Sequence, residues 1–178
     1  MNETWAAWGG VVVFAIAAMP VGGMVAWWLA RGRGWRVAVC EVGMVVGTVP
    51  WLWMILTPKG SGRSVNFLLL RDLTEQAGGS RVIEQFGGNL LVFAALGALL
   101  PVRWAWFGQS YRVLLVAGGA SIVVEAAQFG LAIGRHSSVD DVLLNAFGAC
   151  LAAQFSRRWW VADAGRVDSG RDHVIIHR

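Results

Sequence analysis

Hydrophobic and polar residues divide the chain into long apolar stretches separated by polar connections. Residues 4–30 form the first stretch and contain no charged side chain. A helix crosses the hydrocarbon core of a bilayer, roughly 30 Å thick, with about 20 apolar residues that each rise about 1.5 Å. The pattern therefore predicts an all-α fold, a polytopic transmembrane helical bundle with about five spans near residues 8–30, 37–57, 85–102, 113–133 and 141–160.

The connections between these stretches predict a single transmembrane domain, residues 1–162, followed by a tail at residues 163–178 that is expected to be mobile and cytoplasmic. Residues 58–84 are expected to form a long outer loop, in which residues 65–76 fold as a short amphipathic helix or belong to a flexible linker. A signal peptide describes the first stretch poorly, because the start is not basic and the apolar run is too long.

Composition agrees with a membrane protein. The 178 residues are 56% hydrophobic and 15% charged, whereas soluble domains average roughly 45–50% apolar and about 25% charged residues. The formal charge of +4 comes mainly from arginines that cluster between uncharged stretches, which is typical of membrane proteins and gives no reason to expect a nucleic-acid partner. We therefore expect a multi-pass protein of the cell membrane.

The distribution of basic residues predicts the orientation of the chain. Short cytoplasmic connections of membrane proteins carry an excess of lysine and arginine. Ten of the fifteen basic residues lie in the connections at 31–36 and 103–112 and in the chain from 157 onwards, and five lie in the other two connections. The N-terminus is therefore predicted to be outside and the C-terminus cytoplasmic.

Several polar side chains interrupt the apolar stretches near the predicted outer surface. An ionised side chain at the centre of a membrane helix costs about 2.5–3.5 kcal/mol, so Glu125 requires a specific environment. Gln128 shares a helix face with Glu125, and Asn145 shares one with Asp141. Asn89 lies about one turn inside the third span, so these five residues are expected to form one inward-facing cluster.

Simpler structural roles are open for the same residues. Ser138 or Asp140 can cap the last helix, and Asp141 can favour the positive end of its dipole. The amide side chains of Asn89, Gln128 and Asn145 can have a purely structural role, in which they form hydrogen bonds that hold neighbouring helices together.

These residues also resemble the signature of a known family. The run consists of Glu125, Gln128 and Phe129, then Gly134 and Arg135, then Asp140, Asp141 and Val142, and finally Asn145 and Gly148. This order is similar to that of VanZ-like membrane proteins. The segments Asn89, Phe93 and Gly97, with Ala95 where the family usually has proline, and Asn66 with Phe67 are similar to two further family elements, so the resemblance covers roughly residues 66–155.

The resemblance implies a small protein of the cell envelope whose namesake is associated with resistance to the glycopeptide antibiotic teicoplanin. On this basis, the candidate partners are membrane lipids, a lipid-linked cell-wall precursor or a glycopeptide antibiotic, and no cofactor is expected. The candidate ligand-binding residues are Asn66, Asn89, Glu125, Gln128, Arg135, Asp140, Asp141 and Asn145. Arg135 would bind an anionic headgroup, or would only pair with a neighbouring aspartate.

Two other functions use the same residues. A membrane enzyme acting on a lipid-carried substrate would use Glu125 as general acid or base and Asp140 or Asp141 as its electrostatic partner. A proton-coupled transporter would use Glu125 as the titrating group. No metal is expected because the chain lacks paired ligands at a spacing such as HExxH, and His136 is read as a loop residue. The oligomeric state stays open.

Overall fold

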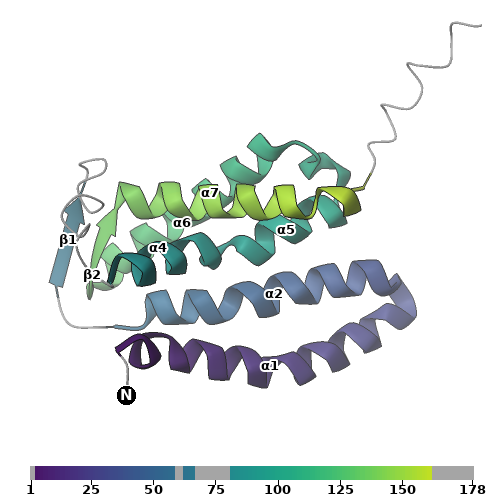
Figure 1. Cartoon of the computed structure of the whole chain (residues 1–178), viewed down its shortest axis with the longest axis horizontal. Helices are drawn as coiled ribbons and strands as arrows, with labels where there is room; N and C mark the ends of the chain where they lie inside the picture. The colour runs from purple at the N-terminus through teal and green to yellow at the C-terminus, as the bar shows by residue number, and fades with distance from the viewer. Residues whose placement is uncertain (1–2, 59–61, 67–80, 162–178) are drawn as a thin grey trace, which may run out of the picture.

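The computed structural model describes residues 3–58, 62–66 and 81–161, and its described residues form a helical bundle with a small ribbon at one end (Figure 1). The helices are α1 (Glu3–Arg33), α2 (Trp35–Leu56), α4 (Arg81–Val92), α5 (Ala94–Arg103), α6 (Ser110–Leu131) and α7 (Val139–Phe155). The two strands are β1 (Gly62–Asn66) and β2 (Ile133–Ser138), and short 3-10 turns lie at Ala105–Phe107 and Arg157–Trp159. The predicted all-α class is confirmed, with the ribbon as an addition.

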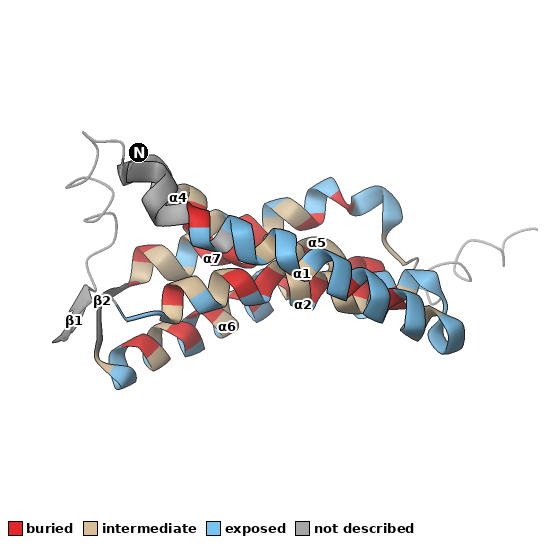
Figure 2. Ribbon diagram, turned by 90° about the horizontal axis from the view of Figure 1, so that it is seen from below, coloured by how far each residue is buried: buried red, intermediate tan, exposed pale blue. Residues whose placement is uncertain are grey.

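Each helix packs on its neighbours in the bundle. α1 packs on α2, α2 on α5, α4 and α5 on α7, and α7 on α6, so α7 contacts three helices and α1 lies at the edge (Figure 1). The central contact is made by mostly small or β-branched buried side chains, including Val92, Val113, Ala117, Ala149 and Ala153. Most of the described surface of α1 is exposed (Figure 2).

Three helices have the length and hydropathy needed to cross a membrane. They comprise Val12–Arg33, Trp35–Leu56 and Ser110–Leu131, and a shorter apolar stretch covers Gly87–Arg103. Large apolar side chains on these helices face outward, among them Trp28, Trp53 and Val123, which are 66%, 71% and 68% exposed. Such a surface is costly in water and favourable in lipid, because exposed apolar area is the quantity that the hydrophobic effect penalises.

The third predicted span, residues 85–102, is not one helix. It is divided at Phe93, whose backbone (φ −110°, ψ 14°) leaves the helical region, and α5 begins at the next residue. The residue two positions later is Ala95, so this break occurs without a proline. We attribute it to packing, since both segments approach the backbone of α7, α4 at Leu90 and α5 at Gly97.

Two glycines permit that approach. A Cβ atom on Gly148 of α7 would overlap the backbone of Leu90, and a Cβ atom on Gly97 would overlap the backbone of Ala149. Small residues allow membrane helices to come close enough for extensive van der Waals contact, which replaces the hydrophobic effect as the driving force in lipid. Because Gly97 and Gly148 have no side chains, the backbones of α4 and α5 can pack directly against the backbone of α7.

The ribbon was not expected from the sequence. β1 and β2 pair in parallel, with Ser64 opposite His136, Val65 opposite Ser137 and Asn66 opposite Ser138. Residues 65 and 66, which were expected to begin an amphipathic helix, belong instead to β1. The remainder of that expected helix, from residue 67 to 76, and the tail at 163–178 lie outside the described residues.

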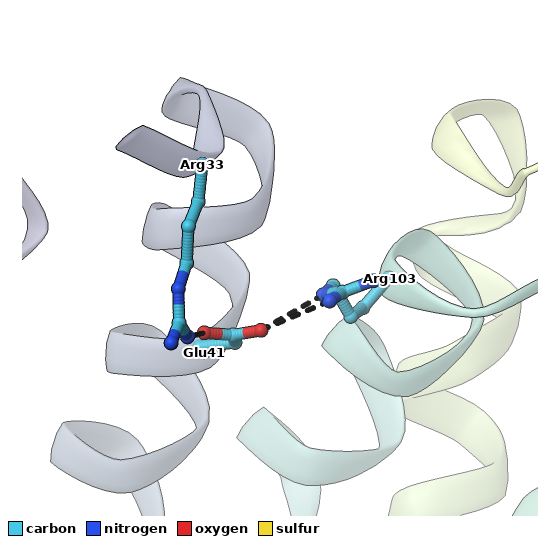
Figure 3. Close-up of polar contacts among 3 residues, drawn as sticks. All are labelled: Arg33, Glu41 and Arg103. Carbon is cyan, nitrogen blue, oxygen red and sulfur yellow. Dashed lines mark hydrogen bonds and ion pairs between the residues drawn. The ribbon is translucent and has the colours of Figure 1, made fainter. Parts of the chain in front are cut away.

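The bundle has two chemically different ends. At one end lie the junction of α1 with α2, the end of α5, the start of α6 and the end of α7; we call this the arginine end (Figure 1). The ribbon and the first residues of α7 lie at the opposite end, which we call the ribbon end. At the arginine end, Glu41 of α2 receives hydrogen bonds from Arg33 (3.1 Å) and from Arg103 of α5 (3.0 Å), which ties three helices together (Figure 3).

Candidate functional site

The first turn of α7 is the centre of the candidate site. Ser138 is the N-cap, and its Oγ accepts a hydrogen bond of 3.2 Å from the backbone N–H of Asp140. This bond satisfies one of the backbone donors that a helix start leaves without a partner. Asp140 and Asp141 lie in the first turn, where the helix dipole favours negative charge. Ser138, rather than Asp140, is therefore the capping residue.

Glu125 of α6 completes this cap from a neighbouring helix. Its Oε2 accepts a hydrogen bond of 3.3 Å from the backbone N–H of Ser138. In a capping box the acceptor for the N-cap N–H is a glutamate or glutamine in the same helix, whereas here α6 supplies it. The half-buried position of the carboxylate is thus explained by a backbone donor at the positive end of α7.

Asn89 of α4 also contacts the first turn of α7. Its Nδ2 donates a hydrogen bond to Oδ1 of Asp141, which links α4 to α7. Side chains from α4, α6 and α7 therefore meet at the start of α7. We call Asn89, Glu125, Ser138, Asp140 and Asp141 the α7 N-terminal cluster; of these, Ser138 and Asp140 are each only 3% exposed.

A second polar contact lies one turn deeper. Asn145 of α7 donates a hydrogen bond of 2.7 Å from Nδ2 to the Oγ of Ser121 on α6, and both residues are buried. Within the part of the chain that the structure describes, the Oδ1 of Asn145 has no hydrogen-bond partner. Sequence reasoning did not select Ser121, although its position four residues before Glu125 puts it on the same helix face.

Gln128 does not contribute its amide nitrogen to the cluster. Its Nε2 donates a hydrogen bond of 2.9 Å to the backbone oxygen of Ile55, in the last turn of α2. The final carbonyl groups of a helix lack partners within that helix, and this one is satisfied by α6. Gln128 is buried and serves as a link between two helices.

For two further candidate ligand-binding residues, Asn66 and Arg135, the structure describes only the position of the backbone. Asn66 is paired with Ser138 across the ribbon, so the β1 strand runs directly beside the helix cap. Arg135 lies in β2, three residues before Ser138. The side chains of both residues lie outside the described part of the structure.

The α7 N-terminal cluster is rich in hydrogen-bonding groups. Carboxylate oxygens accept several hydrogen bonds each, so Glu125 and Asp141 can hold the helix and also face polar atoms of a ligand. Among the described residues, no three histidine, cysteine, aspartate or glutamate side chains are arranged to hold a metal ion. The cluster therefore gathers the carboxylates of Glu125 and Asp141 and the amide of Asn89 at the ribbon end.

Comparison with known families assigns the chain to one of them. A family model described as VanZ/LLP1 matches residues 42–160, which is well over half of the chain. The match begins within α2 and includes every helix of the cluster, whereas α1 lies before it. No curated protein and no solved structure gives a significant match. The chain, with its apolar helices, is a membrane protein that belongs to the VanZ/LLP1 family.

Proposed function

We propose that this VanZ/LLP1 protein is a multi-pass protein of the cell membrane that binds a lipid-linked cell-wall precursor or a lipoglycopeptide at its α7 N-terminal cluster, and that it contributes to teicoplanin resistance. One observation carries the proposal. Polar side chains from three helices, Asn89, Glu125 and Asp141, converge on the first turn of α7 at one end of an otherwise apolar bundle.

The chemistry of such ligands suits this cluster. A peptide or sugar headgroup presents amide and hydroxyl donors, and carboxylate acceptors form the stronger, charge-assisted hydrogen bonds with them. A ligand with a lipid chain would leave that chain in the bilayer and bring only its polar part to the end of the helices. The adjacent β1 strand, which carries Asn66, would border the headgroup.

The geometry favours binding over acid–base catalysis at Glu125. Its carboxylate is engaged by the backbone N–H of Ser138, so its position is tied to the fold of α7. A general acid or base must exchange a proton with the reacting group in a productive geometry. A carboxylate that also secures a helix start is constrained in that exchange.

Antibiotic susceptibility tests the proposal directly. A sensitive Gram-positive host would express the wild-type chain, Glu125→Gln or Glu41→Gln, with equal amounts of protein in the membrane. Glu41→Gln makes the same chemical change at the arginine end and is the matched control. We expect protection against teicoplanin, but not vancomycin, from the wild type and from Glu41→Gln, and its loss in Glu125→Gln. Absence of protection by the wild type would refute the resistance role.

An assay on purified protein distinguishes ligand binding from catalytic turnover. With a lipid-linked precursor added, the proposal expects saturable binding that is weakened in Glu125→Gln, and an unchanged precursor after long incubation. Appearance of a product would instead support the enzyme hypothesis. Proton-driven uptake in proteoliposomes would support a transporter.

A further inference from the structure

The side-chain oxygen of Asn145 is a buried acceptor that the protein does not satisfy. Asn145 is 2% exposed, and its Nδ2 donates a hydrogen bond of 2.7 Å to the Oγ of Ser121 on α6. Its Oδ1 is buried and accepts no hydrogen bond from any described residue. Buried polar atoms of folded proteins nearly always have a partner from the protein or from ordered water, so this oxygen calls for a donor.

The two helices that surround Asn145 do not supply this donor. In the interior of a helix, each backbone N–H is already bonded to the carbonyl oxygen four residues earlier, and Asn145 lies well inside α7. The Ser121 hydroxyl acts as the acceptor for the amide nitrogen of Asn145. The donor for Oδ1 is therefore a group other than the α7 backbone.

Two carboxylates lie one turn closer to the ribbon end. Asp141 precedes Asn145 by four residues on α7, which places both on one helix face, about 6 Å apart along the axis. Glu125 has the same relation to Ser121 on α6. Helix side chains lean toward the N-terminus of their helix, so Asn145 leans toward Asp141. An ionised carboxylate and an amide oxygen are both acceptors, and two acceptors cannot bond to each other.

A water molecule satisfies this arrangement of acceptors. It has two O–H donors, and two hydrogen bonds of about 2.8 Å each reach across as much as about 5.6 Å. This reach is close to the separation of Asn145 and Asp141 along the α7 axis. The Ser121 hydroxyl, which has a hydrogen of its own, can donate a third bond to the water oxygen. Buried waters typically make about three hydrogen bonds.

A second buried oxygen shows why Asn145 in particular calls for water. Thr48 Oγ1 of α2 also has no hydrogen-bond partner among the residues that the structure describes. A threonine hydroxyl inside a helix can donate to the carbonyl oxygen four residues earlier, which belongs here to Met44. Rotation of one bond therefore satisfies Thr48, whereas an amide oxygen can only accept.

We propose that an ordered water molecule is bound between α6 and α7, where it donates hydrogen bonds to Asn145 and Asp141 and accepts one from Ser121. This water extends the hydrogen bonds of the α7 N-terminal cluster one turn further into the bundle. The water site does not depend on the function proposed above, because its three side chains belong to the protein alone.

A structure of the purified full-length protein, at a resolution that shows ordered water, tests the site directly. In the wild type we expect one water at about 2.7–3.2 Å from Asn145 Oδ1. Asn145→Leu, whose side chain has a similar size and no polar atom, should lack it. Well-defined side chains with no water between them in the wild type would overturn the proposal, as would a water retained in Asn145→Leu.

Thermal unfolding in detergent provides a second test. The double variant Asn145→Leu with Ser121→Ala removes both members of the hydrogen-bonded pair, a change that is nearly neutral or stabilising where no other group is bound. With the water in place, we expect a lower unfolding temperature, because Asp141 also loses a donor. Thr48→Val removes the other unsatisfied oxygen and is the matched control, which should unfold at the same or a higher temperature. A double variant at least as stable as the wild type would overturn the water site.

Discussion

Glu125 combines two properties that can be separated by mutation. Its oxygen accepts the backbone N–H of Ser138, and its charge lies near the positive end of the α7 dipole. A glutamine side chain keeps an oxygen acceptor and removes the charge, whereas alanine removes both. The two substitutions therefore distinguish the hydrogen bond from the charge.

We predict that Glu125→Gln is folded and that Glu125→Ala is clearly less stable. Loss of the dipole interaction should cost about 0.3–1 kcal/mol, and loss of a capping acceptor should cost about 1 kcal/mol more. Thermal unfolding of purified protein in detergent, followed by circular dichroism, measures both. If Gln and Ala variants unfold at the same temperature, the capping role of Glu125 is wrong.

The partners of polar residues show what a sequence can and cannot predict. Helical periodicity places Glu125 and Gln128 on one face of α6. Ser121, four residues before Glu125, lies on the same face, so the same spacing predicts its position. The partner of Gln128 is the backbone oxygen of Ile55, 73 residues away in the chain. A backbone carbonyl has no sequence signature, so this contact could not have been predicted.

At the scale of elements, α7 is fixed by backbone contact with α4 and α5. Gly148 faces the backbone of Leu90, and Gly97 faces that of Ala149. Two helices that approach so closely tolerate no added methyl group unless they move apart. Close packing in membrane proteins is the main source of helix association, so that separation is costly.

We predict that Gly148→Ala lowers the amount of folded protein, because its methyl group would overlap the Leu90 backbone. The cost should be about 1–3 kcal/mol, as for other overpacked interiors. Gly119→Ala is the control, since an added Cβ at that position on α6 has open space around it, and alanine favours a helix over glycine by about 0.5–1 kcal/mol. Thermal unfolding measures both variants. A Gly148→Ala protein as stable as the wild type would contradict the close contact.

Helices that depend on local hydropathy could be predicted from the sequence, whereas features that depend on contacts with distant residues could not. Long apolar stretches specify helices locally, and the helices lie where hydropathy expects them. The break at Phe93 and the ribbon depend on distant partners, the backbone of α7 and a strand more than sixty residues away. The ribbon residues also lack a run of alternating apolar side chains, since β2 reads Ile-Gly-Arg-His-Ser-Ser.

At the scale of the whole molecule, the two ends differ in charge as well as in structure. Among the described residues, the arginine end holds Arg31, Arg33, Arg36, Arg103, Arg112, Arg157 and Arg158, whereas the ribbon end holds Arg63, Arg81 and Arg135. Exposed tryptophans accompany the first group, including Trp27, Trp104 and Trp159. This asymmetry indicates which end remains on the cytoplasmic side during insertion.

We predict that the arginine end is cytoplasmic and that the ribbon end faces outward. Single cysteines at Gly32 and Ser64, in a chain whose Cys40 and Cys150 are replaced by alanine, report the two ends. A membrane-impermeant maleimide should label Ser64→Cys in intact cells and Gly32→Cys only after permeabilisation. Positive charges near span ends are retained in the cytoplasm, so this pattern follows from the arginine count. Labelling of Gly32→Cys in intact cells would reverse the orientation and move the α7 N-terminal cluster to the cytoplasmic leaflet, beyond the reach of an extracellular antibiotic.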